Sequence, residues 1–255
     1  MNQYRDQPET IISQIIKELN GLIISGQTWT KKQQLFLKNR HLQNLSLLPQ
    51  IKETDLGLEI GLCEGILALT LKRHFSLKKL YALEHPGFCH QFSRKYLKKI
   101  STEGICLKQG DLHTDKLPFS ANFFDFMTLC EVCEHLIPAK IPTVLAEIRR
   151  TLKKKGWLLL TTPNITSLIK RAKLLIGQNP VKLDLGVYGK GTYGHIREYT
   201  MREMTTLLQK HGFKILEKSY FSNDQKRNFF LRLESLSGNL IPSFNNGLAI
   251  LAQKI

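Results

Sequence analysis

The sequence has no long apolar segment. No apolar run reaches the roughly 18 to 20 residues that a helix needs to cross a bilayer. The opening residues, Met-Asn-Gln-Tyr-Arg-Asp, also lack the apolar core of a secretory signal peptide. These two absences predict a cytoplasmic protein.

Cysteine is scarce, and its positions form no metal or disulfide framework. The five cysteines stand at positions 63, 89, 106, 130 and 133, without the paired spacing of a zinc site. Cys130 and Cys133 make a Cys-x-x-Cys, but no thioredoxin-like context surrounds them, so buried thiols are favoured over a redox or zinc pair. No Ser-His-Asp or Cys-His constellation for nucleophilic catalysis is visible.

Acidic residues are few relative to basic ones. The chain of 255 residues has 37 Lys and Arg against 21 Asp and Glu, a formal net charge of +16. Such an excess suits an anionic partner, whether a nucleic acid, a phospholipid surface or a phosphorylated sugar. A solvated basic surface explains it equally well.

What the sequence does contain is a strand, a glycine-bearing turn and a helix within residues 55–73. Residues 56–60 alternate as a short apolar strand, Gly61 and Gly65 mark the turn, and leucines follow at helical spacing. Glycines at such a turn let the backbone approach a ligand closely. About twenty residues later a second strand ends in Glu84, where folds of this kind bind ribose hydroxyls. The pattern therefore favours an adenosyl ligand.

The string Leu-Glu59-Ile-Gly61-Leu-Cys63-Glu-Gly65 resembles the signature of class I S-adenosylmethionine-dependent methyltransferases. Cys63 stands where that family has its middle glycine, so its side chain would narrow the loop. A third strand and its exit follow at 105–112, matching the place where the family's acid caps the adenine amino group. The residues that the resemblance assigns to the cofactor are Glu59, Gly61, Cys63, Gly65, Glu84, Asp111 and Leu112.

Residues 117–136 form the most specific passage. They read Leu-Pro-Phe, a short turn, Phe-Asp, a strand and then Glu-x-x-Glu-His-Leu, all of which the family shares. A second passage, His195-Ile-Arg-Glu-Tyr-Thr200, resembles a Gly-His-x-Arg-aromatic-Thr motif of methyltransferases that modify glycans, lipids and quinones. The resemblance is thus to the type 11/23-like members, among them O-methyltransferases. Thr200 and Glu203 also predict a capping box that begins a helix.

The implied fold is α/β, a Rossmann-like, mostly parallel seven-stranded sheet with an antiparallel C-terminal hairpin. We expect an N-terminal helical cap over residues 1–50 and the methyltransferase domain over 51–255, with an insertion after the fifth strand at 165–194. Single helices are predicted at 9–21, 32–48, 87–100 and from about Thr200 to Gly212. Another helix is expected to have Pro142 in its first turn and Gly156 just past its end. The basic residues of the second helix are interpreted as a solvated face, with a role in holding an anionic substrate as the alternative: Lys31, Lys32, Lys38, Arg40 and His41.

The insertion is basic as well as apolar. Residues 165–197 carry six Lys or Arg against Asp184, a difference of 6 − 1 = +5. Lys170, Arg171 and Lys173 alternate with apolar residues at helical spacing, a pattern typical of a helix that covers the core or lies on an anionic membrane surface. A cytoplasmic protein that associates peripherally with a membrane is therefore one expectation.

The predicted activity is methyl transfer from S-adenosylmethionine, with oxygen as the expected acceptor atom and His195 and Glu131 as catalytic residues. Such transfer depends on holding the nucleophile in line and excluding water, so no conspicuous nucleophile is required. A small-molecule, sugar or lipid-type acceptor is preferred. The alternatives are a metal-dependent 2′-O-methyltransferase of an RNA ribose and a non-catalytic binding module, the latter motivated by Cys63.

The sequence also predicts a divalent-metal site. Carboxylates and imidazoles suit magnesium, manganese or zinc, which would lower the pKa of an attacking hydroxyl. The set resembles that of small-RNA 3′-end 2′-O-methyltransferases, and it comprises Glu131, Glu134, His135 and His195. In the alternative interpretation, Glu131 contacts the cofactor, Glu134 and His135 cap a helix, and His195 bonds within the insertion.

Overall fold

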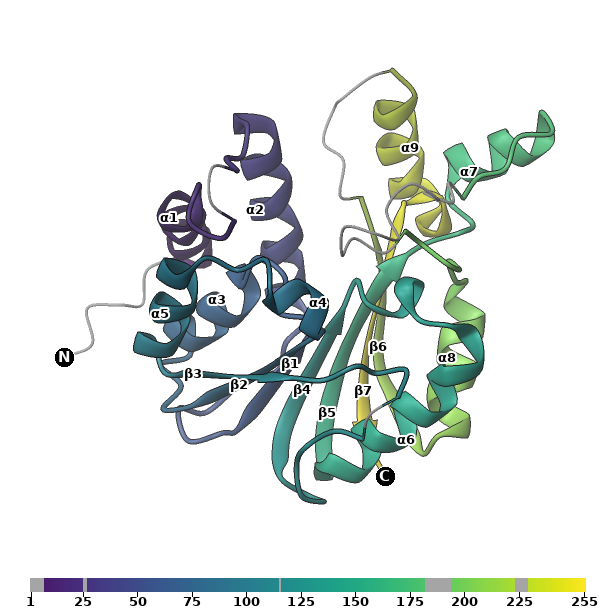
Figure 1. The fold of residues 1–255 in the computed structure, drawn as a ribbon. Helices are drawn as coiled ribbons and strands as arrows, with labels where there is room; N and C mark the ends of the chain where they lie inside the picture. Colours follow the sequence, from purple (N-terminus) through teal and green to yellow (C-terminus); the bar gives the residue numbers. More distant parts are fainter. Residues whose placement is uncertain (1–6, 25–26, 115, 182–193, 223–228) are drawn as a thin grey trace.

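The computed structural model describes residues 7–24, 27–114, 116–181, 194–222 and 229–255. Its centre is one seven-stranded sheet in the order β3-β2-β1-β4-β5-β7-β6 (Figure 1). The first five strands run parallel, and β7 pairs antiparallel with both β5 and β6. The strands are β1 Gly57–Ile60, β2 Leu80–Glu84, β3 Ile105–Gln109, β4 Phe124–Cys130, β5 Leu152–Pro163, β6 Phe213–Phe221 and β7 Gly247–Lys254. The predicted sheet, including its C-terminal hairpin, is confirmed.

Helices cover both faces of the sheet (Figure 1). They are α1 Pro8–Leu19, α2 Lys31–Ser46, α3 Ile66–His74, α4 Pro86–Cys89, α5 Arg94–Thr102, α6 Ile141–Thr151, α7 Leu168–Leu175, α8 Met201–Lys210 and α9 Phe229–Leu240. The described residues also contain three short 3-10 turns: η1 Cys133–His135, η2 Pro138–Lys140 and η3 Pro242–Phe244. None of the helices in the described ranges is both long and apolar enough to cross a membrane.

Strand alternation divides the core into two layers. Leu58 and Ile60 of β1 point to the side covered by α6 and α8, where they join residues such as Leu145 and Met204. The opposite layer packs α1, α2, α3 and α5 against the sheet. Fully buried side chains such as Leu145 carry much of the stability, and Leu→Ala at such a site costs about 2 to 5 kcal/mol.

Two sequence-based boundaries are wrong. The helix expected over 87–100 is two helices, because Ser93 accepts a hydrogen bond from the Tyr96 N–H and starts α5 as a new N-cap. The helix expected to end beside Gly156 ends at Thr151, and Gly156 belongs to β5. A Cβ at Gly156 would lie 2.9 Å from the Asp125 carbonyl oxygen, so this glycine serves a close strand contact.

The second helix does not present all its basic residues to solvent. His41 is buried and Arg40 is largely enclosed, with 20% of its side chain exposed. Burial, and then the neighbouring Arg40, lower the pKa of His41 to about 3, so this imidazole is neutral at physiological pH. The solvated-face interpretation therefore fails for these two residues.

The two ends of the insertion after β5 lie side by side. Asn164 and Tyr199 form an isolated parallel bridge, and the Ile165 N–H donates to the Tyr199 carbonyl. The glycine-rich stretch of the insertion, with Lys182, Asp184 and Lys190, falls largely within residues 182–193, which lie outside the described residues. Beyond the insertion, the predicted capping box is confirmed, since the Glu203 N–H lies 3.1 Å from Thr200 Oγ1 and the Thr200 N–H lies 2.8 Å from Glu203 Oε2.

Candidate functional site

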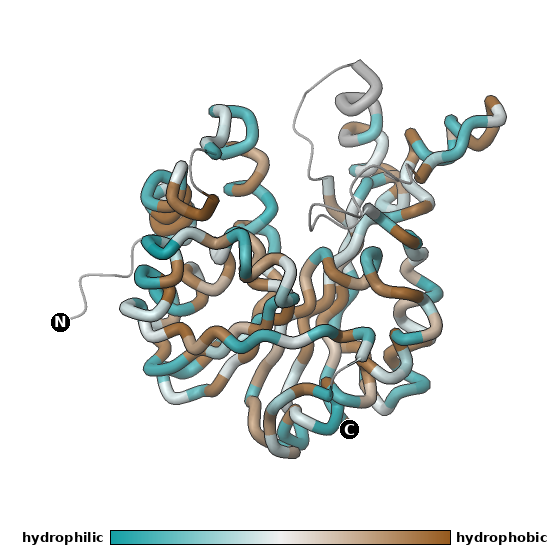
Figure 2. Tube along the Cα trace, viewed as in Figure 1, coloured by the Kyte–Doolittle hydropathy of each residue, from teal (hydrophilic) through white to brown (hydrophobic). Residues whose placement is uncertain are grey.

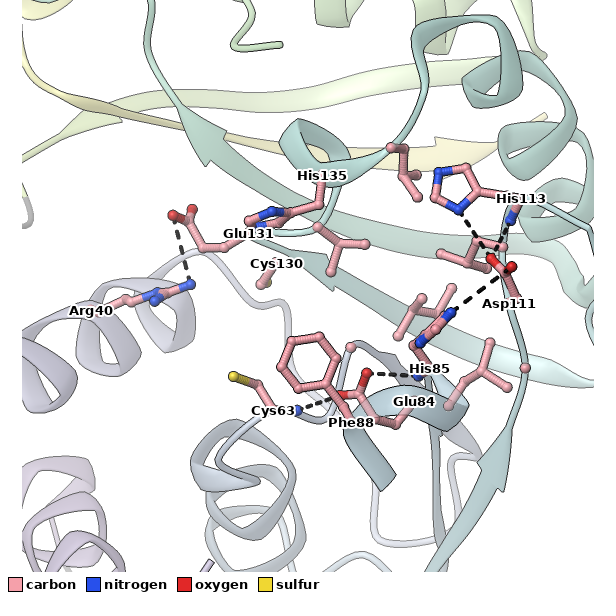
Figure 3. Close-up of a pocket in the computed structure, with 17 residues that line it drawn as sticks. Arg40, Cys63, Glu84, His85, Phe88, Asp111, His113, Cys130, Glu131 and His135 are labelled. Atoms are coloured by element: carbon pink, nitrogen blue, oxygen red, sulfur yellow. Dashed lines mark hydrogen bonds and ion pairs between the residues drawn. The ribbon is translucent and has the colours of Figure 1, made fainter. Parts of the chain in front are cut away.

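A pocket opens at the carboxyl ends of β1, β2, β3 and β4, with about 830 Å³ of empty volume (Figure 3). This is the edge where open parallel sheets bind ligands. The pocket is lined by Arg40, Ile60, Gly61, Cys63, Leu83, Glu84, His85, Phe88, Gly110, Asp111, Leu112, His113, Cys130, Glu131, Val132, His135 and Leu136. Five of the seven predicted cofactor residues are in this lining.

The turn after β1 needs its glycines. Gly61 has φ +85° and Gly65 φ +72°, a region that side chains disfavour. A Cβ on Gly61 would lie 2.6 Å from Val132 Cγ2, and one on Gly65 would lie 2.5 Å from the Tyr96 hydroxyl oxygen. Cys63 also has positive φ, +46°, which explains why a glycine suits its position. Its side chain is exposed and lines the pocket, as the sequence predicts for a residue that narrows the loop.

Glu84 joins β2 to this turn. Its Oε2 accepts from the Cys63 N–H at 2.7 Å, and its Oε1 accepts from the His85 N–H at 2.7 Å (Figure 3). Burial raises the pKa of Glu84 despite these two bonds. Each carboxylate oxygen retains a second lone pair, so Glu84 can also accept from ligand hydroxyls.

Glu59 lies deeper, at the end of β1. It is 5% exposed, and its Oε2 has no hydrogen-bond partner among the described residues. Burial, followed by repulsion from Glu84, raises the pKa of Glu59 well above its ordinary value. An unpartnered carboxylate beside a glycine turn fits a ligand that brings a hydrogen-bond donor or a positive charge.

Asp111 and His113 shape the far end of the pocket. Asp111 Oδ1 accepts from the His113 N–H at 2.8 Å and faces His113 Nδ1 at 3.0 Å. His113 Nε2 accepts from the Ile137 N–H at 3.2 Å, so Nδ1 carries the proton. Burial opposes ionisation, but the bonds from His113 outweigh it and lower the pKa of Asp111. The carboxylate at the predicted adenine end is therefore ionised, with Leu112 beside it in the pocket lining.

Arg40 reaches the pocket from α2, opposite Glu131 at the end of β4. Arg40 Nη2 lies 3.6 Å from Glu131 Oε2, and Thr161 Oγ1 donates to Glu131 Oε1 at 2.9 Å (Figure 3). Burial alone would lower the pKa of Arg40, but Glu131 and Glu64 outweigh it and raise that pKa. The sequence interpretation preferred a solvated face for Arg40 and gave a role in holding an anionic substrate only as the alternative. The helical spacing of Arg40 from the buried Asn44 was the available signal for its orientation.

Glu134, His135 and His195 meet beside the pocket. One ligand atom from each lies within 4.8 Å of the others, and the two imidazole rings pack edge to face with centroids 5.1 Å apart. The Glu134 carbonyl accepts from the N–H groups of Ile196 and Arg197, which holds the end of the insertion against η1. The structure thus brings together three of the four predicted metal residues, while the Glu131 carboxylate lies outside this cluster and faces Arg40 and Thr161.

Glu134 is fully buried, and Thr162 Oγ1 donates to its Oε2 at 2.9 Å. Its Oε1 has no hydrogen-bond partner in the described ranges. Burial and the nearby Glu131 raise the pKa of Glu134 well above its ordinary value. The group is therefore a carboxyl that either a proton or a bound cation would stabilise.

His195 contacts Glu198, a residue that the sequence analysis did not predict to be functional. Its Nδ1 lies 3.1 Å from Oε1 of Glu198, whose side chain is 6% exposed and whose other oxygen pairs with Lys170 Nζ. Burial opposes ionisation of Glu198, but His195 and Lys170 outweigh it and lower its pKa. Since an ionised carboxylate only accepts, Nδ1 carries the proton and Nε2 of the neutral ring is the basic atom. The spacing of three residues between His195 and Glu198 was the available signal.

Comparison with known proteins agrees with this geometry. A family model described as a methyltransferase domain matches residues 31–218, well over half of the chain. A search of curated protein sequences finds no significant match.

Solved structures share the fold at low sequence identity. A Haloferax volcanii methyltransferase, solved in complex with the Trm112 methyltransferase activator, has TM-score 0.60 and 14% identity, covering 85% of this chain and 90% of that chain. An Archaeoglobus fulgidus SAM-dependent methyltransferase has TM-score 0.56 and 16% identity, with coverage of 84% and 94%. Phosphoethanolamine N-methyltransferase 2 of Haemonchus contortus, bound to phosphomonomethylethanolamine and S-adenosylhomocysteine, has TM-score 0.57 and 17% identity, with coverage of 85% and 52%.

The fold, the glycine turn with its two acids and the family match lead to one assignment. The chain belongs to the class I S-adenosylmethionine-dependent methyltransferases.

Proposed function

We propose that this methyltransferase methylates an oxygen atom of a small-molecule, sugar or lipid-type acceptor, with His195 as the general base. The observation that carries the proposal is the His195–Glu198 pair, because a buried carboxylate fixes the tautomer and leaves Nε2 as a proton acceptor. An acceptor nitrogen that is already a free amine would not need this pair. The Haemonchus neighbour, which was solved with phosphomonomethylethanolamine bound, supports a small acceptor in general.

The residues of the pocket fit S-adenosylmethionine, which supplies an electrophilic methyl group on a sulfonium when bound. Glu84 would accept from the ribose hydroxyls, and Asp111 with Leu112 would face the adenine. Glu59, whose Oε2 has no partner among the described residues, would oppose the amino group of the methionine part. Arg40 would hold its carboxylate, with Glu131 as the counter-ion when the pocket is empty.

In the proposed reaction, His195 Nε2 takes the proton from the acceptor hydroxyl while the Nδ1 proton remains on the Glu198 side. Glu198 stabilises the imidazolium that forms, and Lys170 keeps Glu198 ionised. Arg40 of α2 lines the pocket, and a bound cofactor and acceptor would displace water from it, which would strengthen these interactions. Glu131, which contacts Arg40 and Thr161 beside the pocket, would orient the acceptor.

A second candidate keeps the reaction and adds a divalent ion. The meeting of Glu134, His135 and His195 favours it, because Glu134 Oε1, which has no hydrogen-bond partner among the described residues, would gain a cation and Glu198 would orient His195 as a ligand. Magnesium, manganese or zinc would lower the pKa of the acceptor hydroxyl there. If a metal were required, an RNA ribose would be the acceptor that is consistent with both the metal and the basic surface of the protein.

The deciding experiment assays methyl transfer to a panel of hydroxyl acceptors and RNA 3′ ends, with and without chelator. We expect full activity in chelator and a loss of about 10²- to 10⁴-fold in kcat for His195→Ala. Glu198→Gln should shift the acid limb of the pH–rate profile, whereas a merely structural Glu198 would lower activity equally at all pH values. Activity abolished by chelator and restored by one added metal would instead select the second candidate.

Calorimetric titration with S-adenosylmethionine separates both enzymes from a non-catalytic module. The enzymes should bind the cofactor with measurable heat. Absence of binding at any cofactor concentration tested would favour a module in which Cys63 closes the loop, and restored binding in Cys63→Gly would identify that residue as the cause.

A further inference from the structure

Helix α7 projects from the body of the molecule and ends in three exposed aliphatic residues (Figure 1). Leu174, Leu175 and Ile176 are 58%, 87% and 69% exposed. Three consecutive residues point in three directions around a helix, so their common exposure means that the end of α7 is surrounded by solvent on most sides. Figure 2 shows apolar segments on this projecting arm. Contiguous exposed apolar residues of this size usually mark an interaction surface.

The base of α7 is held firmly. The Ile169 N–H donates to Glu234 Oε1 of α9 at 3.1 Å, and Lys170 pairs with Glu198. The guanidinium of Arg171 lies 5.2 Å from the centre of the Phe244 ring. The apolar end is therefore presented by a fixed helix rather than by a loose segment.

The chain segment that forms this end carries charge of one sign. Residues 164–181 contain no acid, and they contain Lys170, Arg171 and Lys173. Lys170 is neutralised by Glu198, but neither Arg171 nor Lys173 forms an ion pair with an acid in the described ranges. Lys173 thus precedes the three aliphatic residues without an acidic partner in the described ranges. Arg171 contacts the Phe244 ring and donates to the Thr166 carbonyl and Ser243 Oγ, and these neutral groups leave its positive charge in place. This combination complements an anionic lipid surface, where headgroup phosphates meet acyl chains.

The helix that packs against α7 also carries exposed aliphatic residues. Leu240 and Ile241, at the end of α9, are 86% and 47% exposed, and α9 packs against α7. Both helices rise from the edge of the sheet that carries the pocket (Figure 1). A surface docked here would bring its lipids towards the methyl-transfer site.

We propose that the end of α7 inserts into an anionic bilayer surface, with Leu174, Leu175 and Ile176 among the acyl chains and Arg171 and Lys173 at the phosphates. This refines the sequence expectation, because Lys170 is used within the protein. The interaction is independent of which group acts as the catalytic base. Each cation near such a surface contributes about fivefold in affinity at low salt.

The test is sedimentation of the full chain with vesicles of phosphatidylcholine alone or mixed with phosphatidylglycerol. The wild type should sediment with the mixed vesicles and be partly released by salt. Leu175→Ser with Ile176→Ser should abolish sedimentation at every salt concentration. Arg171→Gln with Lys173→Gln should weaken it more than tenfold on mixed vesicles only. Leu97→Ser, at a 37% exposed residue of α5, is the matched control and should behave as wild type.

Thermal melting of each variant shows whether it remains folded. Failure of the wild type to sediment with mixed vesicles would overturn the proposal, as would unchanged sedimentation of the folded Leu175→Ser, Ile176→Ser variant. A dimer in size-exclusion chromatography that this variant converts to a monomer, without vesicle binding, would assign the surface to a second copy and also overturn it.

Discussion

Two groups of charged residues in this protein differ in how completely they are paired. Behind the sheet, Arg73 binds Glu18 through two nitrogens at 3.0 and 2.8 Å, and Lys99 lies 2.6 Å from Glu18. Glu103 closes the cluster with Arg73. In and beneath the pocket, by contrast, Arg40 and Glu131 are 3.6 Å apart, and Oε2 of the buried Glu59 has no hydrogen-bond partner among the described residues. The first group stabilises the fold, whereas charged atoms of the second group remain able to form hydrogen bonds or ion pairs with a ligand.

The pKa directions express the same difference. The hydrogen bond from Arg73 is the largest influence on Glu18 and, against burial, lowers its pKa to about 2. Burial raises the pKa of Glu59 well above its ordinary value. Ionised Glu18 therefore adds to folding stability, and ionised Glu59 subtracts from it. Mutation of Glu59 should therefore change cofactor affinity, whereas mutation of Glu18 should change the melting temperature.

The largest expected effect is on cofactor affinity. Glu84→Ala removes the acceptor for the Cys63 and His85 N–H groups and for the ribose, so we expect binding weaker by about 1 to 3 kcal/mol, or about 5- to 150-fold. Calorimetric titration measures it, with the exposed Glu53→Ala as control. A dissociation constant equal to that of the wild type would remove Glu84 from the site.

The next effect concerns stability. Glu18→Gln should lower the free energy of unfolding by about 1 kcal/mol at neutral pH, or about 2 to 4 °C in Tm, with unchanged cofactor affinity. Because the folded pKa is lowered, this stability is present above the ordinary pKa of 4.5 and is lost as the pH falls towards about 2. Melting curves at several pH values test this, and Glu9→Gln, an exposed pair on the same helix, should change little. Equal losses of stability in Glu18→Gln and Glu9→Gln would show that the cluster around Glu18 has no special role in stability.

The smallest expected effect is an increase in stability, opposite in sign to the effect of Glu18→Gln. Glu59→Gln removes a carboxyl whose pKa is raised, so the wild type should lose stability as the pH rises above the ordinary pKa of 4.5 while the variant does not. We expect the variant to melt about 1 to 3 °C higher at pH 8, corresponding to less than about 1 kcal/mol, yet to bind the cofactor more weakly. A lower melting temperature with unchanged binding would place Glu59 among the structural acids.

Regular patterns in the sequence predicted most of the fold. Strand alternation, the glycine turn and the Thr200 capping box depend on neighbouring residues, so they can be read locally. The break before α5 was missed because apolar spacing continued through Ser93, although a serine before a helical run is itself an N-cap signal.

The site was predicted in part for the same reason. Residues at strand ends, such as Glu84 and Asp111, follow from the topology of a parallel sheet. Arg40 could not be placed, because α2 buries polar residues such as His41 and Asn44 on its inner face and so hides its orientation from a hydrophobic pattern. Glu198 meets His195 within one turn of chain, but only the buried position of its side chain shows that the contact is significant.

The backbone angles at Cys63 and Glu131 have a consequence for mutational tolerance. Both are non-glycine residues with positive φ, +46° and +56°, and both line the pocket. Each conformation costs roughly 1 to 2 kcal/mol, which glycine would recover and asparagine would reduce. In a saturation library, selection for abundance should therefore enrich glycine and asparagine at these positions and deplete valine and isoleucine. Selection for activity should instead retain glutamate at position 131. Comparing the two selections would therefore identify positions where the residue needed for activity lowers the stability of the fold.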